Sequence, residues 1–141
     1  MCIRDRCGEA GPIIVYNQAF EKRIIAGLAA AFADLSEALQ ALNGRVVDLL
    51  PIVKRNYYHP DMKGSWSIKS VLPCLVRGLR YDGLGGVQGG TQAQQAYFDL
   101  VGGELDAKAA ERLHRDLLAY CALDTFAMVE IVRKLQGEAD A

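Results

Sequence analysis

The stretch Pro12-Ile13-Ile14-Val15-Tyr16 is a short, β-branched apolar run of the kind that forms buried strands. Asn17 comes next and is a favourable residue for a helix N-cap. Apolar side chains then recur at four-residue steps, which predicts a helix that buries one face: Phe20, Ile24, Leu28 and Phe32. This order of strand, cap and helix is the first half of an α/β unit.

The second half of the unit repeats the pattern. Residues 33–42 are predicted to form a second helix, which Asn43-Gly44 ends. The run Arg45-Val46-Val47-Asp48 is a second strand candidate, and Asp48 is placed to cap a helix over residues 49–58. Both strands are short and strongly apolar, as parallel strands tend to be. Because two strands do not make a stable sheet, we expect residues outside this sequence to complete it.

The remainder of the chain is predicted to be helical. One helix spans residues 67–76 and is disturbed at Pro73, and another spans residues 91–101. Between them, residues 81–90 form a glycine-rich loop, which is no phosphate-binding loop because no Lys-Ser/Thr ends it. Asp106 is predicted to cap a final helix that reaches Leu135. The chain is therefore expected to be a helix-rich α/β protein.

The final helix carries one charged residue in its apolar stripe. Asp124 is the exception in a row that is otherwise apolar or aromatic: Leu113, Leu117, Tyr120, Asp124, Met128, Ile131 and Leu135. Burying a carboxylate is costly unless a metal ion, a basic partner or hydrogen-bond donors compensate its charge. Tyr120 lies four residues earlier, so its hydroxyl can reach the same place. Asp124 is either a functional carboxylate or the structural partner of a base, and Tyr120 is either its functional neighbour or a core aromatic.

Composition bounds the class of protein. The 141 residues suffice for one domain with its own core, and the net charge is -1. The four cysteines form no CxxC pair, so we expect reduced thiols. The sequence shows no secretory signal and no stretch long enough to span a bilayer, which predicts a cytoplasmic protein without a membrane partner.

Positive charge is concentrated in one segment. Between Lys54 and Arg80 there are six basic residues and a single acid, Asp61, so the local charge is +5. Aromatic residues are interleaved with these bases: Tyr57, Tyr58 and Trp66. Cations with stackable rings suit single-stranded nucleic acid, and a solvated basic face is the alternative.

The beginning of the chain differs in character from the rest. Residues 1–6, Met-Cys-Ile-Arg-Asp-Arg, show no periodicity and no cap, and they look like a translated sequencing adapter. A short disordered native start is the alternative. We therefore expect residues 1–10 to be an artefactual or disordered leader, residues 11–137 to be one truncated domain, and residues 138–141 to be a frayed tail. The chain would then be the carboxyl-terminal fragment of a longer protein.

Four motifs, in order, carry a resemblance to a known family. They are Tyr16-Asn17-Gln18-Ala19-Phe20-Glu21, Gly64-Ser65-Trp66-Ser67-Ile68-Lys69, Tyr81-Asp82-Gly83-Leu84 and Tyr120-Cys121-Ala122-Leu123-Asp124-Thr125. The first and last are similar to the second and third motifs of the DEDD 3′-5′ exonucleases, the DnaQ-like branch of the ribonuclease H-like fold. All four resemble a bacterial family catalogued as domain of unknown function 2779, whose members often carry an upstream RecB-like nuclease region.

The resemblance implies an incomplete ribonuclease H-like fold and two-metal hydrolysis of DNA or RNA, most readily as single strands. Glu21 and Asp124 would ligate Mg²⁺ or Mn²⁺, and Tyr120 would orient the attacking water. Asn17 would shape the site, while Trp66 and Lys69 are candidates for nucleic-acid contact, with packing and solvation as their alternatives.

The sequence departs from that family pattern in two places. Glu21 stands where an Asp is usual, and the first motif, Asp-x-Glu on the first strand, is missing. We therefore expect the fragment to be inactive alone. The alternative is a non-catalytic module on the same fold that binds nucleic acid or a protein partner.

Overall fold

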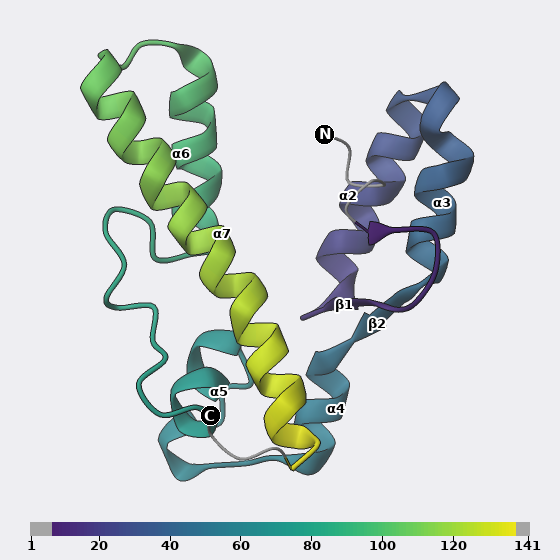
Figure 1. Cartoon of the computed structure of the whole chain (residues 1–141). Helices are drawn as coiled ribbons and strands as arrows, with labels where there is room; N and C mark the ends of the chain where they lie inside the picture. Colours follow the sequence, from purple (N-terminus) through teal and green to yellow (C-terminus); the bar gives the residue numbers. More distant parts are fainter. Residues whose placement is uncertain (1–6, 138–141) are drawn as a thin grey trace. The chain divides into compact units, whose positions relative to one another are not determined.

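A computed structural model describes residues 7–137 (Figure 1). These residues fall into two compact units, 7–58 and 59–137. Residues 1–6 and 138–141, which hold most of the predicted leader and the predicted frayed tail, lie outside the described residues.

The first unit is an α/β element built on two parallel strands. Strand β1 (Ile13–Val15) pairs with β2 (Val46–Asp48), and the register places Ile13 opposite Val46 and Val15 opposite Asp48. Helix α2 (Gln18–Ala31), the short η1 turn (Ala33–Leu35) and α3 (Ser36–Gly44) connect the two strands. Helix α4 (Leu49–Asn56) comes after β2. The predicted strands, their parallel pairing and the helices around them are confirmed.

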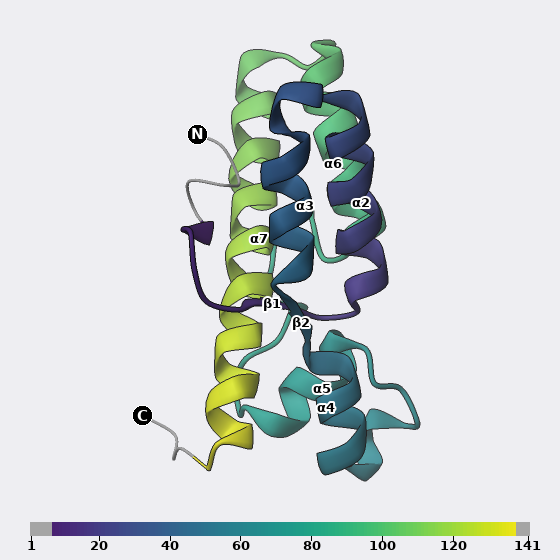
Figure 2. The ribbon, with the colours of Figure 1, turned by 90° about the vertical axis from the view of Figure 1, so that its right-hand side faces the viewer.

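Helices α2 and α3 lie side by side and form the core of this unit (Figure 2). Ala29, Leu39 and Leu42 are buried between them, and Ile25 and Leu28 pack against this cluster. Of the face predicted for α2, Leu28 packs as expected, but the other three positions are wrong: Phe20, Ile24 and Phe32 are 57%, 45% and 50% exposed. Apolar residues occur nearly all round α2, so its periodicity does not select a face, and contact with α3 selects the neighbouring stripe.

Asp48 fastens the edge of the sheet at which both strands end. Its Oδ1 accepts hydrogen bonds from the backbone N–H of Asn17 at 2.8 Å and of Leu50 at 2.9 Å, and its Oδ2 accepts one from Gln18 N–H at 3.0 Å. One carboxylate thus satisfies the first amides of α2 and of α4, where the helix dipoles favour negative charge. The prediction that Asp48 caps α4 is confirmed. Asn17 does occupy the N-cap position of α2, but its side chain makes no capping bond, and Asp48 caps that helix instead.

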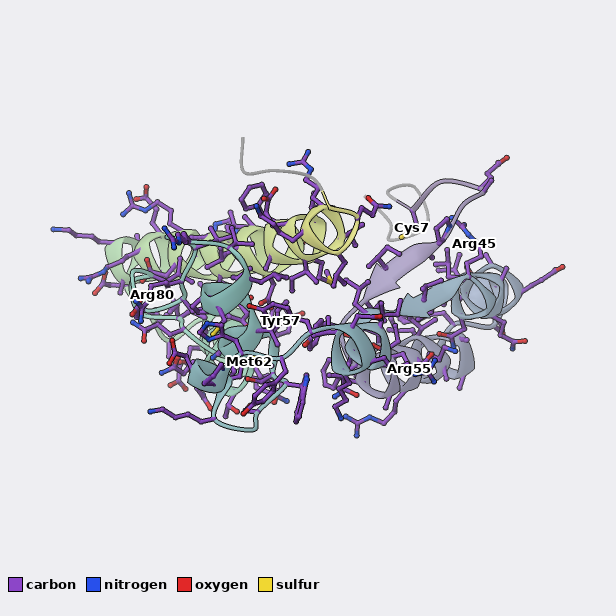
Figure 3. All side chains as sticks on the ribbon, turned by 90° about the horizontal axis from the view of Figure 1, so that it is seen from below. Cys7, Arg45, Arg55, Tyr57, Met62 and Arg80 are labelled. Carbon is purple, nitrogen blue, oxygen red and sulfur yellow. The ribbon has the colours of Figure 1, made fainter. Side chains whose placement is uncertain are left out.

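At the opposite end of the sheet, the Arg45 guanidinium holds the chain that leads into β1. It donates to the backbone carbonyls of Cys7, Gly8, Ala10 and Gly11 over 2.7–2.8 Å. The Cys7 side chain also packs against the core cluster of α2 and α3, and Figure 3 shows Cys7 and Arg45 close together beside β1. Residues 7–11 are therefore bonded into the first unit.

The second unit is helical. A 3-10 turn η2 (Pro60–Met62) leads into α5 (Ile68–Leu75), and the glycine-rich loop then runs to α6 (Gly90–Gly102). Helix α7 (Ala107–Leu135) packs along both α5 and α6 (Figure 1). The Asp106 carboxylate accepts from Ala109 N–H at 2.9 Å, which confirms the predicted cap. Every member of the predicted α7 stripe is buried or half-buried, Asp124 included.

The structure confirms the helix-rich α/β class, with a sheet of two parallel strands among residues 7–137. The more specific expectation of an incomplete ribonuclease H-like fold stays a prediction. None of the helices in this described part is both long and apolar enough to cross a bilayer.

Replacing Asp48 by Ala is expected to destabilise the first unit. Two helix N-termini lose their shared acceptor, and a lost cap costs about 0.5–2 kcal/mol per helix, so we expect the free energy of unfolding to fall by roughly 1–4 kcal/mol. Urea unfolding measures the loss, and hydrogen exchange should accelerate at the amides of Asn17, Gln18 and Leu50.

Asp34→Ala is the matched control, because this exposed acid in η1 makes no hydrogen bond within the described chain. If hydrogen exchange at the three amides is as slow in Asp48→Ala as in the wild type, the carboxylate does not hold the sheet edge in place.

Candidate functional site

The predicted functional carboxylate, Asp124, has a phenol as its partner. The Tyr81 hydroxyl donates to Asp124 Oδ1 over 2.5 Å, a length typical of a charge-assisted O–H···O⁻ bond. Tyr81 lies just after α5, 43 residues before Asp124 in the chain, and only 6% of its surface is exposed. Of the compensations predicted for the buried charge, the structure thus shows a hydrogen-bond donor.

Tyr120 completes a cluster of two phenols around one carboxylate. Its ring centroid lies 6.1 Å from that of Tyr81, with the rings tilted by 52°, and its own exposure is 8%. Burial, and then the charge of Asp124 and hydrogen bonding to it, raise the pKa of Tyr120 above the ordinary value. Burial, and then the hydrogen bond to Asp124, likewise raise the pKa of Tyr81. Both phenols therefore stay protonated at neutral pH, and the Tyr81 hydroxyl donates to the carboxylate.

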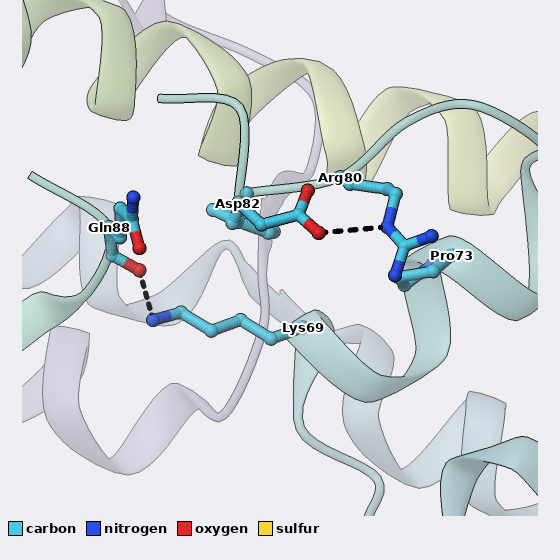
Figure 4. A pocket seen from close by; sticks show the side chains of 6 residues that line it. Lys69, Pro73, Arg80, Asp82 and Gln88 are labelled. Carbon is cyan, nitrogen blue, oxygen red and sulfur yellow. Dashed lines mark hydrogen bonds and ion pairs between the residues drawn. The ribbon is translucent and has the colours of Figure 1, made fainter. Parts of the chain in front are cut away.

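The glycine-rich loop that carries Tyr81 is tied down at two places. Gly86 N–H donates to Asp116 Oδ2 of α7 at 3.0 Å. The Lys69 ammonium group donates to the Gln88 carbonyl oxygen (Figure 4) and lies 5.6 Å from the centroid of the Tyr81 ring. The structure therefore brings three of the four sequence motifs together, through Lys69, Tyr81 and the Tyr120–Asp124 pair.

Two cavities share Lys69 in their lining, and Tyr81 of the cluster lines the smaller one. One of about 290 Å³ is lined by six residues, drawn in Figure 4: Lys69, Pro73, Arg80, Tyr81, Asp82 and Gln88. The other, about 830 Å³, is lined by the η2 turn, α5 and the segment after α5, and we call it the basic groove. Its charged lining consists of four cations and one acid: Lys63, Lys69, Arg77, Arg80 and Asp61. Four of the six bases in the positive segment predicted from the sequence thus line a concave surface, whereas the aromatic residues interleaved with them do not.

The motif in the first unit sits at the edge of the sheet where both strands end. Tyr16 directly succeeds β1, and burial, with the nearby charge of Asp48, raises its pKa to about 12. Asn17 is exposed and has a φ of 73°, a left-handed conformation that Asn tolerates. Glu21 lies half-buried in the first turn of α2. Glu21 and Asp124 belong to different units, so their convergence on shared metal ions stays a prediction.

Metal-ligating side chains do not gather into a metal site among the described residues. Residues 7–137 contain no group of three or more His, Cys, Asp or Glu side chains placed to hold an ion. The cluster in the second unit offers one carboxylate, and Tyr81 already donates to it. Of the predicted nucleic-acid contacts, Lys69 lines both cavities, while Trp66 is half-buried between η2 and α5.

Sequence reasoning missed the role of Tyr81. The motif Tyr81–Leu84 is part of the family resemblance, but nothing in it indicates that its phenol pairs with Asp124. A chemical signal could have suggested the pair. A carboxylate in an apolar stripe requires a hydrogen-bond donor, and the motif that contains Tyr81 offers a phenol. The helical periodicity that places Tyr120 beside Asp124 carries no information about a loop residue 43 positions away.

A family model described as a domain of unknown function (DUF2779) matches residues 2–67. This match covers just under half of the chain and supports the family resemblance. It contains the Tyr16–Glu21 motif and the beginning of the Gly64–Lys69 motif, whereas the Tyr81 and Tyr120 motifs lie outside it. Neither a curated protein nor a solved structure matches the chain.

Tyr81→Phe is expected to destabilise the second unit. The change leaves the ring in place but removes the donor to a half-buried carboxylate, which should lower the free energy of unfolding by about 1.5–3 kcal/mol. Tyr97→Phe is the matched control, because Tyr97 is 57% exposed and its hydroxyl makes no hydrogen bond within the described residues. If urea unfolding shows an equally small loss of stability in Tyr81→Phe and Tyr97→Phe, the assigned hydrogen bond is contradicted.

The same bond predicts a loss of stability at alkaline pH. Because the pKa of Tyr81 is raised in the folded state, the fold keeps a proton that the unfolded chain releases near pH 10. Its contribution is therefore fully present below that pH and is lost as the pH rises above it, by up to about 1.4 kcal/mol per pH unit. The free energy of unfolding, measured at a series of pH values from neutral to alkaline, should therefore fall less steeply with pH in Tyr81→Phe than in the wild type.

Proposed function

We propose that the chain contributes part of the active site of a metal-dependent 3′-5′ exonuclease-type domain, which hydrolyses phosphodiester bonds in DNA or RNA. The observation that carries the proposal is the cluster around Asp124. Two phenols, one carboxylate and a lysine meet there from three motifs that are well separated in the sequence. Such a concentration of titratable groups beside a cavity is typical of active sites.

In this function Asp124 would be a metal ligand, and Tyr120 would position the attacking water. Divalent metal ions supply the activation of water and the stabilisation of phosphoryl charge in this class of reaction. Glu21 would add a second carboxylate. The Asp-x-Glu motif that the resemblance requires is not in this sequence. The chain by itself is therefore proposed to be inactive, and catalysis would belong to a longer bacterial, cytoplasmic protein.

One observation favours a second candidate, a non-catalytic module that binds nucleic acid or a protein partner. The Tyr81 hydroxyl occupies Asp124 Oδ1, so the carboxylate is already satisfied in the fold without a metal. In that case the cluster would serve only to attach the glycine-rich loop to α7. Metal binding at Asp124 distinguishes the two candidates.

Manganese ions provide this test on the chain itself. We expect Mn²⁺ to broaden NMR resonances around Asp124 in the wild type, more strongly in Tyr81→Phe, and not in Asp124→Asn. Tyr81→Phe strengthens the effect because it removes the competing donor. Glu111→Gln, which neutralises an exposed acid elsewhere on α7, serves as the matched control. Broadening that is unchanged by Asp124→Asn would leave the non-catalytic module as the function.

A longer protein that supplies an Asp-x-Glu strand before Gly11 tests the catalytic role. There, Asp124→Asn should lower metal-dependent cleavage of a labelled oligonucleotide by at least about 10²-fold, since even a displacement of about 1 Å in such a site has that effect. Glu111→Gln should leave the rate unchanged. Cleavage by Asp124→Asn at the wild-type rate would refute the assignment.

A further inference from the structure

We infer that the basic groove of the second unit binds the sugar-phosphate backbone of single-stranded nucleic acid and leads it towards the Tyr81–Asp124 cluster. The choice of nucleic acid as the ligand rests on the proposed function. The site itself rests on the charge, accessibility and position of the groove.

The lining of the basic groove carries an excess of positive charge. The lining carries four cations and one carboxylate, a formal charge of +3, on a chain whose net charge is -1. The cations come from three segments: Lys63 lies directly after η2, Lys69 is on α5, and Arg77 and Arg80 come after α5. Positive groups spread along a groove match a repeating phosphate backbone better than a single phosphate ion.

The cations are also available to a ligand. Lys63 and Arg77 are exposed, and neither makes an ion pair with another described residue. Arg80 pairs with Asp82 over 3.2 Å, but both side chains are more than 60% exposed, so water screens this pair strongly. Lys69 is held by the neutral Gln88 carbonyl, which leaves its positive charge uncancelled (Figure 4). The Arg80–Asp82 pair is the one charged contact among these described cations that a phosphate would have to replace.

The groove also lies next to the Tyr81–Asp124 cluster. Lys69, Pro73 and Arg80 line both the basic groove and the smaller cavity, so the two recesses share a wall. Tyr81 lines the smaller cavity, and its hydroxyl is bonded to Asp124. A strand held in the groove would therefore run next to the cluster. A recess of about 830 Å³ leaves room for a flexible single strand, whose backbone can follow the positively charged lining.

Fluorescence anisotropy with a labelled oligothymidylate of about twelve nucleotides tests the inference. The measurement is made in EDTA over a range of salt concentrations, so that metal binding at Asp124 plays no part. Lys63→Asn/Arg77→Gln removes two groove cations, and Asn is chosen at position 63 because φ there is 50°. We expect affinity to fall roughly tenfold and the salt slope to shrink by about 1.4.

Lys108→Gln/Arg112→Gln is the matched control. It removes the same charge from exposed positions on α7 that do not line the groove, and it should bind within about twofold of the wild type. Equal weakening by both double variants, tighter binding to a duplex, or binding to anionic vesicles but not to the oligonucleotide would each overturn the inference. Failure of the wild type to bind the oligonucleotide, together with intact Mn²⁺ broadening at Asp124, would refute the groove and leave the proposed function standing.

Discussion

The arrangement of the second unit depends on a carboxylate that lies on the apolar face of a long helix. Asp124 is half-buried on α7 within a stripe that otherwise packs Tyr120, Ala127 and Ile131. Leaving such a charge without a donor would cost several kcal/mol, so a donor has to be brought to it. The loop after α5 supplies Tyr81 as this donor. Because Tyr81 has to reach Asp124, the bond fixes where the loop passes α7. The position of the loop also determines where Arg80 and Asp82 stand beside the smaller cavity.

Carboxylates perform the same structural task elsewhere in the chain. On α7, Asp106 caps the helix and Asp116 holds Gly86 of the loop. In the first unit, Asp48 gathers three backbone amides from α2 and α4. Each of these acids is explained by the donors that surround it. Asp124 differs because its donor is the Tyr81 hydroxyl rather than a backbone amide, because a second phenol, Tyr120, packs against Tyr81, and because Tyr81 lines a cavity. That difference is the reason for proposing a functional role for Asp124 and a structural role for the other three.

Local patterns predicted most of the elements. The two strands, the cap at Asp48, the cap at Asp106 and the stripe on α7 all depend on residues within a few positions of one another, and they are confirmed. The buried face of α2 could not be read in this way, because its apolar residues surround the helix and α3 determines which of them are covered. The Tyr81–Asp124 bond was missed for a related reason: it joins a loop to a helix across 43 residues, and no periodic signal spans that distance.

The glycine-rich loop shows why composition alone is a weak guide to a site. Five glycines in residues 81–90 suggest a phosphate-binding loop. In the structure, however, the loop approaches charged side chains of its own unit. A Cβ atom at Gly85 would lie 2.8 Å from Asp116 Oδ1, and one at Gly89 would lie 2.7 Å from Lys69 Nζ. The Gln92 side chain accepts from Gln88 N–H just before α6, so one backbone donor of the loop is already paired within the protein. The polar side chains that anchor the loop thus lie close against glycine backbone, and the positive charge of this unit is found instead on the side chains of the neighbouring basic groove.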